Sequence, residues 1–163
     1  MAKTLLDGKD LKLGLFSANC SSGMAVTKIE DRWKATWDDN LALGKLADEV
    51  GIDFMLPIAR WIGYGGETNF HEGVLDPVAL AAGLLAETER IFVFATIHTA
   101  FNHPVVTAKA MATVDQIGKG RAGLHRPGQA RRRSRSQKAR RCGVNRVQAP
   151  HRQRGARHSG QQY

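Results

Sequence analysis

Short apolar runs alternate with longer amphipathic segments over the first 124 positions of the chain. The apolar runs predict four strands, at 11–16, 52–56, 91–97 and 121–124. The amphipathic segments predict three helices between them, over 36–50, from 77 to just before 90, and from about 104 to 117. This β-α-β-α-β-α-β order predicts a parallel α/β sheet with right-handed crossovers.

Each predicted helix carries one apolar stripe at helical spacing. The stripes are Leu43, Leu46, Ala47 and Val50 in the first helix, Val78, Ala81, Ala82 and Leu85 in the second, and Val106, Ala110, Thr113, Val114 and Ile117 in the third. Gly51 stands where a helix C-cap glycine belongs, and Asp76 with Pro77 is typical of a capped helix start. Gly118 and Gly120 end the third helix.

Two long polar segments, 17–34 and 57–73, interrupt this order. Loops longer than about 12–15 residues inside a compact domain tend to carry function. The second segment is rich in glycine and aromatic residues, and its glycines Gly63, Gly65 and Gly66 superficially resemble a phosphate loop. No helix follows them at the spacing that such a loop needs, so we interpret them as residues that bend the segment.

The pattern leaves two architectures open, a doubly wound sheet and a (β/α)8 barrel. The predicted strands begin near residues 11, 52, 91 and 121, which makes roughly three and a half βα units. A complete barrel typically takes about 250 residues. If the fold is a barrel, these units are less than half of it.

Composition changes abruptly after residue 124. The segment 125–163 holds 12 of the 24 Lys and Arg residues and none of the 15 Asp and Glu residues, so the net charge of +9 comes from this tail. The tail has Val144, Val147 and Tyr163 as its large apolar residues, which predicts disorder. The two cysteines, Cys20 and Cys142, indicate neither a disulfide framework nor a zinc site. No apolar run reaches 18 residues, and we expect a soluble, cytoplasmic protein.

Two hypotheses account for the tail. Arginine outnumbers lysine in it by 11 to 1, which is typical of a GC-rich message read out of frame. The alternative is a natural arginine-rich arm that binds nucleic acid nonspecifically in a salt-dependent way. The tail has no aromatic residue for base stacking before its terminal Tyr163 and no known nucleic-acid-binding module, which favours the first hypothesis. Sequencing the coding DNA across codons 120–130 would decide between them.

Three stretches of the chain resemble the bacterial-luciferase-like flavin monooxygenases, and within them the branch of pyrimidine, dimethyl sulfone and alkanesulfonate monooxygenases. They are LKLGLFSAN (11–19), FMLPIARWIGYGGET (54–68) and IFVFATIHTAFNHPVVTAKAMATVDQIGKGR (91–121). The most specific part is the run Ala110 to Asp115 followed by GKGR at 118–121. The resemblance covers about 115 residues and implies the N-terminal part of a (β/α)8 barrel with a site at the C-terminal ends of its strands.

The resemblance also implies the chemistry. It implies reduced FMN as cofactor, O2 as co-substrate, a small organic substrate and a separate flavin reductase, with a homo-oligomer possible. Candidate FMN contacts are Ala59, Arg60, Thr96 and His98, and candidate substrate contacts are Trp61 and Tyr64. After Leu124 the family continues with a flavin-binding Asn and an Ile-Val strand, whereas this chain has His125 and RPGQARRR. An alternative within the superfamily is a deazaflavin F420-dependent oxidoreductase, which the 57–73 loop disfavours.

Several residues also have a purely structural interpretation. His71 could face substrate or solvent, and His103 fits a turn. The aromatic side chains of the 57–73 loop, Phe70 included, could line a substrate pocket or pack the loop onto the barrel. Asp115 and Arg121 are expected to form a structural ion pair between a helix end and a strand start.

Overall fold

The computed structural model describes residue 5 and residues 11–127. These residues belong to one compact unit, Met1–Gly128. The rest of the predicted tail, from residue 128 onward, lies outside the described residues. The proposals that the tail is disordered, out of frame or able to bind nucleic acid therefore stay predictions.

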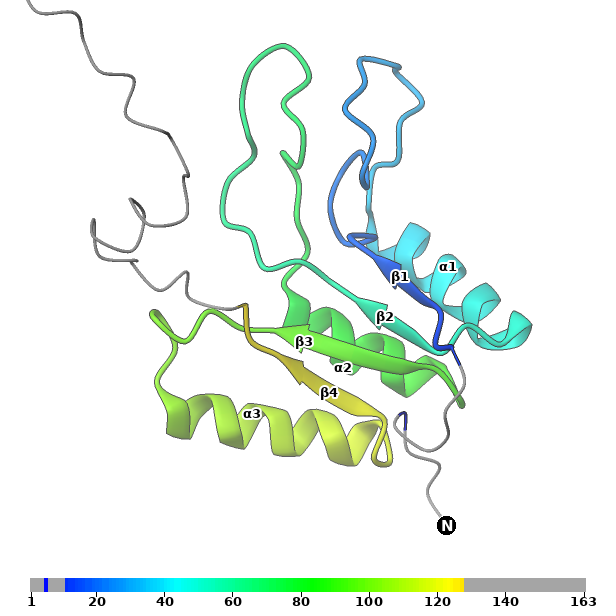
Figure 1. Ribbon diagram of the computed structural model, residues 1–163, viewed down its shortest axis with the longest axis vertical. Helices are drawn as coiled ribbons and strands as arrows, with labels where there is room; N and C mark the ends of the chain where they lie inside the picture. The colour runs from blue at the N-terminus through cyan, green and yellow to red at the C-terminus, as the bar shows by residue number, and fades with distance from the viewer. Residues whose placement is uncertain (1–4, 6–10, 128–163) are drawn as a thin grey trace, which may run out of the picture. The chain divides into compact units, whose positions relative to one another are not determined.

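The predicted order of elements is confirmed. The strands are β1 (Gly14–Phe16), β2 (Phe54–Leu56), β3 (Phe92–Thr96) and β4 (Ala122–His125), and the helices are α1 (Trp37–Val50), α2 (Pro77–Glu87) and α3 (Pro104–Ile117). The strands are parallel and lie in the order β1-β2-β3-β4 (Figure 1). Within the described part of the chain, no helix is long and apolar enough to cross a membrane.

The position of the helices resolves the choice between the two architectures. A doubly wound sheet has helices on both faces and reverses its strand order at a switch point. Here the strand order never reverses, and all three helices contribute to one buried cluster on one face of the sheet. This is the arrangement of successive units in a β/α barrel.

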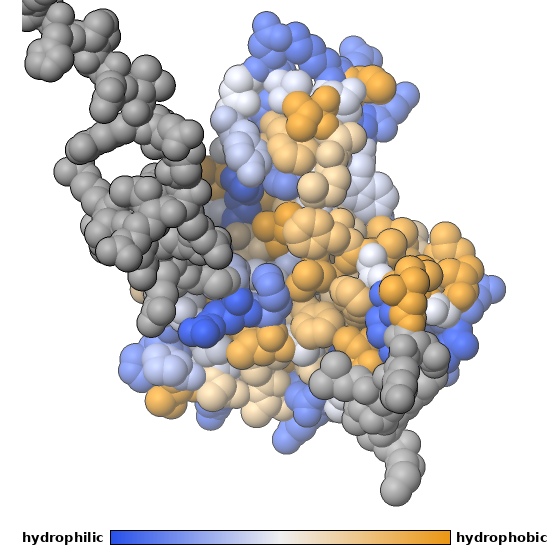
Figure 2. Space-filling view, viewed as in Figure 1, coloured by the Kyte–Doolittle hydropathy of each residue, from blue (hydrophilic) through white to orange (hydrophobic). Residues whose placement is uncertain are grey.

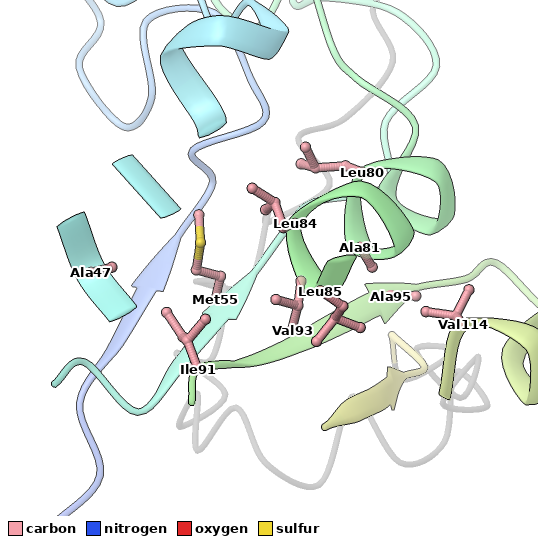
Figure 3. Close-up of a cluster of buried hydrophobic side chains, with 10 residues drawn as sticks. All are labelled: Ala47, Met55, Leu80, Ala81, Leu84, Leu85, Ile91, Val93, Ala95 and Val114. Carbon is pink, nitrogen blue, oxygen red and sulfur yellow. The ribbon is translucent and has the colours of Figure 1, made fainter. Parts of the chain in front are cut away.

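The core lies between the sheet and the helices (Figure 3). From the sheet, Met55, Val93 and Ala95 point into it, and each is at most 1% exposed. The buried residues of the helices and of the segment before β3 complete the cluster: Ala47, Leu80, Ala81, Leu84, Leu85, Ile91 and Val114. Burial of this apolar surface is the main force that holds the helices on the sheet.

The opposite face of the sheet is also apolar (Figure 2). Phe54 and Phe94 meet edge to face on it, with ring centroids 5.6 Å apart. Gly14 and Gly123 leave room for these rings, because a Cβ atom would lie 2.2 Å from the Phe54 ring at the first position and 2.3 Å from the Phe94 ring at the second. Large and small residues therefore alternate across this face, as they do in small barrel interiors.

The predicted helix ends are confirmed in detail. Gly51 ends α1 in the left-handed conformation, with φ of 85°. The Asp76 carboxylate accepts hydrogen bonds from the backbone of Val78 and Ala79 at the start of α2. Pro77 occupies the first turn, where its missing N–H costs nothing.

The predicted stripe of α1 is wrong in part. Leu46 is 56% exposed and Val50 66% exposed, whereas Asn40 and Gly44 are buried beside Ala47. The reason is close packing at Gly44, where a Cβ atom would lie 2.8 Å from the Leu84 side chain of α2. A face of small residues brings α1 near α2 and turns its larger side chains outward.

The predicted apolar stripe of α3 faces α2, but most of its residues are not buried. All five predicted positions line an apolar groove along α2, yet Val114 alone among them is buried, and Val106 is 66% exposed. Within the described residues, nothing covers the outer side of this groove. Periodicity predicts which face of a helix is apolar, but not whether another element covers it.

The expected ion pair between Asp115 and Arg121 is also wrong. The Arg121 guanidinium donates instead to the carbonyl oxygens of Leu85, Thr88 and Ile91, at 2.7–2.9 Å, and to the Thr88 hydroxyl. The last turn of a helix leaves its carbonyl groups without partners, and Arg121 satisfies two of them at the end of α2. The arginine of the GKGR run therefore joins α2 to the starts of β3 and β4.

Candidate active site

A cleft of about 340 Å³ lies where the C-terminal ends of β2 and β3 meet the starts of α2 and α3. It gathers five of the six candidate residues: Ala59, Arg60, Trp61, Thr96 and His98. The sixth, Tyr64, does not line it. The parallel arrangement of the strands explains the gathering, because their carboxyl ends meet at one edge of the sheet.

The irregular segment 57–59 follows β2 and reaches the wall of the cleft at Ala59. Three consecutive carbonyl groups in it accept hydrogen bonds from side chains of other segments. Thr96 Oγ1 donates to Pro57 at 2.5 Å, Asn19 Nδ2 to Ile58 at 2.8 Å and His98 Nε2 to Ala59 at 2.7 Å. Backbone outside regular structure needs such partners when it is buried, and they fix its course.

The Thr96 hydroxyl group takes part in two hydrogen bonds, one as donor and one as acceptor. Its single hydroxyl hydrogen goes to the Pro57 carbonyl, so His125 Nδ1, 3.2 Å away, carries a hydrogen and donates to Thr96. Thr96 and His125 are register partners at the ends of β3 and β4. Thr96 therefore lines the cleft and holds three strand ends together, and its hydroxyl group has no hydrogen left for a ligand.

Asn19 was not predicted as a site residue, yet it organises the cleft from behind. It is fully buried, and its amide also donates to the Leu75 carbonyl and accepts from the Ile58 amide. Beside it, burial raises the pKa of the Cys20 thiol, outweighing the opposing effects of a Ser17 hydrogen bond and the Arg60 charge. Cys20 is thus an unreactive packing residue. Asn19 could not be predicted, because a single polar residue after a strand gives no sequence signal that it holds the backbone of a cleft.

Arg60 lies at the edge of the cleft without a carboxylate partner among the described residues. Its guanidinium lies 3.9 Å from the centre of the Tyr64 ring and donates to the Tyr64 hydroxyl group at 2.5 Å. Its Nε atom is buried and has no hydrogen-bond partner. Tyr64 in turn stacks on Phe70, with centroids 5.6 Å apart. Tyr64 thus reaches the site by orienting Arg60.

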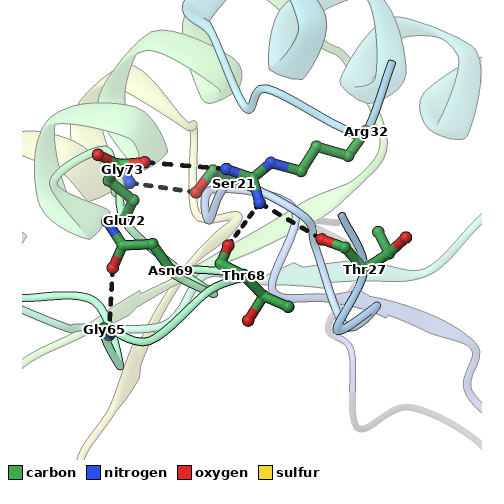
Figure 4. Close-up of polar contacts among 8 residues, drawn as sticks. All are labelled: Ser21, Thr27, Arg32, Gly65, Thr68, Asn69, Glu72 and Gly73. Atoms are coloured by element: carbon green, nitrogen blue, oxygen red, sulfur yellow. Dashed lines mark hydrogen bonds and ion pairs between the residues drawn. The ribbon is translucent and has the colours of Figure 1, made fainter. Parts of the chain in front are cut away.

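Hydrogen bonds and an ion pair join the loops 17–34 and 57–73 (Figure 4). Arg32 donates to the Thr68 and Thr27 carbonyls and lies 3.8 Å from a Glu72 carboxylate oxygen. His71 is 2% exposed, and its Nε2 atom lies 2.6 Å from the Gly23 carbonyl oxygen. His71 therefore does not face solvent, and it does not line the cleft. It joins the two loops, which form a stiff rim beside the cleft.

The glycines of the second loop bend it, as predicted. Gly65 and Gly66 have φ of 70° and 72°, in the left-handed region that glycine adopts without strain. Gly63 permits a close approach, because a Cβ atom there would lie 2.9 Å from the Glu72 backbone.

Comparison with known proteins agrees with this geometry. The luciferase-like monooxygenase family matches residues 11–126. The pyrimidine monooxygenase RutA of Pantoea ananatis is 32% identical over 115 residues, which are 71% of this chain and 32% of that protein. The structure of riboflavin lyase RcaE, with modified FMN and riboflavin, matches 73% of this chain and 30% of its own, with a TM-score of 0.61 and 26% identity. EDTA monooxygenase EmoA from Chelativorans sp. BNC1 shares the fold over the same fractions, with a TM-score of 0.62 and 20% identity.

Parallel strands in unreversed order and helices on one face define a segment of a β/α barrel, with a cleft at the carboxyl ends of its strands. The chain belongs to the luciferase-like monooxygenase family. It spans about a third of the length of the curated relatives that it matches.

Proposed function

We propose that this chain contributes the first part of the active site of a monooxygenase that uses reduced FMN and O2 to oxidise a small organic substrate. The observation that carries the proposal is the gathering of Ala59, Arg60, Trp61, Thr96 and His98 around one cleft. The family to which the chain belongs supports the reaction class. A separate flavin reductase would supply the reduced cofactor.

The groups at the cleft fit a flavin ring. Arg60 offers a guanidinium that no carboxylate neutralises within the described residues, and a planar cation of this kind suits the electron-rich edge of a reduced flavin. The Ala59 amide has no acceptor in the described part of the chain and can donate to a ring carbonyl group. Thr96 contributes by holding the wall rather than by donating to the ligand.

When bound, the flavin would supply the oxygen chemistry, which protein side chains cannot provide. The residues of this chain then have three tasks. Arg60 holds negative charge at the ring, the 57–59 segment fixes the ring's position, and Trp61 shields the cleft from water.

Titration of the full chain with FMN, followed by quenching of flavin fluorescence, tests the proposal. Arg60→Gln should weaken binding by about tenfold, because one charge-assisted hydrogen bond is lost. Arg90→Gln is the matched control, since Arg90 bonds to backbone carbonyls at the other end of the sheet. Absence of FMN binding by the unaltered chain, or equal affinities for all three proteins, would refute the proposal.

Oxygen transfer itself is tested with a flavin reductase and isotope-labelled O2. We expect one labelled oxygen atom in the product once the remaining barrel segments are supplied by fusion to a relative. Label appearing only in hydrogen peroxide would show that the flavin reacts without transferring oxygen to a substrate.

A further inference from the structure

A short turn after β3, residues 98–102, places a second aromatic side chain against Trp61 and His98, two residues that line the cleft. Phe101 on this turn is 74% exposed, and Trp61 on the neighbouring loop is 77% exposed. Their rings meet edge to face, with centroids 6.3 Å apart and planes at 73°. Phe101 makes a second edge contact with His98, also at 6.3 Å. Large aromatic side chains that are exposed together at a cleft indicate a binding surface.

Two hydrogen bonds close the turn that carries Phe101. The His98 carbonyl oxygen accepts hydrogen bonds from the Phe101 amide at 3.1 Å and from Asn102 Nδ2 at 3.0 Å. The next residue, His103, caps α3, whose first turn begins with Pro104. The turn is therefore closed at both ends by hydrogen bonds and by a helix start.

The same turn presents hydrogen-bond acceptors. A carbonyl group can only accept, so the 2.7 Å contact with the Ala59 carbonyl requires a hydrogen on His98 Nε2. In the neutral ring, Nδ1 then has a free lone pair. Neither Nδ1 nor Asn102 Oδ1 has a partner among the described residues, and both side chains line the cleft.

We propose that the 98–102 turn and Trp61 recognise the substrate, and that this substrate is a neutral planar ring with an O–H or N–H donor at its edge. Its ring packs against Trp61 and Phe101, and its donor binds His98 Nδ1. This inference rests on the proposed function, because it assigns the substrate side of the same cleft. It assigns His98 to substrate binding, whereas the resemblance of the sequence implies that His98 contacts the flavin.

The arrangement disfavours two other classes of substrate at this position. The two acceptors repel a carboxylate or sulfonate group at this position, and the Arg60 guanidinium, the cation of the same cleft that could attract one, is assigned to the flavin. A saturated hydrocarbon chain would cover His98 Nδ1 without pairing it, and a buried acceptor without a partner is costly. Phenols, hydroxypyridines and lactams satisfy both the flat aromatic surface and the acceptor.

Three small ligands test the requirement for a planar ring separately from the requirement for a hydrogen-bond donor. Phenol is planar and carries a donor, anisole is planar and lacks one, and cyclohexanol carries a donor on a ring that is not planar. Isothermal titration of the full chain should show phenol binding at least about tenfold more tightly than either of the others, as expected for an unpaired acceptor or a lost ring contact.

Variants in the turn assign the effect to residues. His98→Phe keeps an aromatic ring and removes the acceptor, so it should abolish the preference for phenol over anisole. Phe101→Leu removes the ring packed against Trp61 and should weaken both ligands, and Thr99→Ala, at an exposed position of the same turn that carries no ring, should change neither. Circular dichroism establishes that each variant is folded.

FMN titrations of the same variants separate this inference from the proposed function. We expect Phe101→Leu to bind FMN as the unaltered chain does, whereas His98→Phe also loses the hydrogen bond to the Ala59 carbonyl and should bind FMN more weakly. Equal affinity of the unaltered chain for phenol and anisole, no phenol binding, or an unchanged preference for phenol in His98→Phe would each overturn the inference. Loss of FMN binding by the unaltered chain would refute the proposed function instead.

Discussion

Replacing Arg121 with methionine would remove the group that joins α2 to the starts of β3 and β4. Arg121 Nη1 donates to Thr88 Oγ1 at 3.1 Å and to the Ile91 carbonyl at 2.9 Å. Nη2 donates to the Leu85 and Thr88 carbonyls at 2.8 and 2.7 Å. Methionine keeps the apolar stem, so the substitution isolates the loss of the charged donors.

The size of the effect follows from these four bonds. A hydrogen bond from a charged donor contributes about 1.5–3 kcal/mol, and the four are not additive because they share one group. Burial lowers the pKa of Arg121, more than the charges of Asp48 and Glu89 raise it, so the guanidinium already carries a desolvation cost that its removal relieves. We expect Arg121→Met to lower the free energy of unfolding by about 2–4 kcal/mol, a large part of the 5–15 kcal/mol typical of a domain.

Urea unfolding of the full chain at low protein concentration, followed by circular dichroism, measures this loss. Arg121→Lys should fall between the two proteins, because an ammonium group keeps the charge but not the planar fork. Lys119→Met, an exposed change two positions away, should alter stability by less than about 0.5 kcal/mol. If Arg121→Met were no more destabilising than this control, the helix-end role of Arg121 would be refuted.

Three further predictions test other parts of the structure. Burial alone would raise the pKa of Asp48, but the amides of residues 89–91 donate to its carboxylate and lower it, so stability should fall as the pH drops through this lowered value. The midpoint of urea unfolding, measured as a function of pH, should decrease as the pH drops below 3.8, the ordinary pKa of an aspartate. If Asp48→Asn showed the same pH profile as the unaltered chain, this role of Asp48 would be contradicted. Asn19→Ala should cost about 2–4 kcal/mol in urea unfolding, since two carbonyls and one amide lose their buried partner; a loss no larger than that of an exposed substitution would rule this out. Gly63→Ala should cost about 1–3 kcal/mol through its clash with the Glu72 backbone. Gly73→Ala, whose Cβ would have room, is its matched control, and equal losses would count against the close approach.

Local rules of the chain predicted the elements and their ends. Gly51 and the Asp76-Pro77 pair each act on neighbours within four residues, so their effect can be read without knowing the fold. The strand β3, apolar on both faces, is buried toward the helices at Val93 and carries Phe94 on the other face. What periodicity could not predict is the packing of whole elements, such as the approach at Gly44 that turns Leu46 outward.

The candidate site was predicted only in part, and for a similar reason. The resemblance gave six candidate residues, which lie after β2, at the end of β3 or just after β3. Five of the six line one cleft. The resemblance did not give Asn19, which lies 39 positions before its partner Ile58, or the hydrogen bond between Thr96 and His125 across 29 positions. Contacts at such separation depend on the register of the strands, which a single sequence does not specify.

The cleft is preorganised by side chains that act on backbone. Thr96, Asn19 and His98 come from two different strand ends, yet each holds one carbonyl of the three-residue segment 57–59. These hydrogen bonds hold the backbone that presents the Ala59 amide and the neighbouring Arg60 side chain to the cleft. A site built in this way does not have to order its own wall when it binds, so more of the contact energy remains as affinity. It follows that substitutions at Asn19 or Thr96 should weaken FMN binding although neither side chain contacts FMN. Substitutions at Arg60 should weaken FMN binding, and those at Phe101 substrate binding, by removing a direct contact.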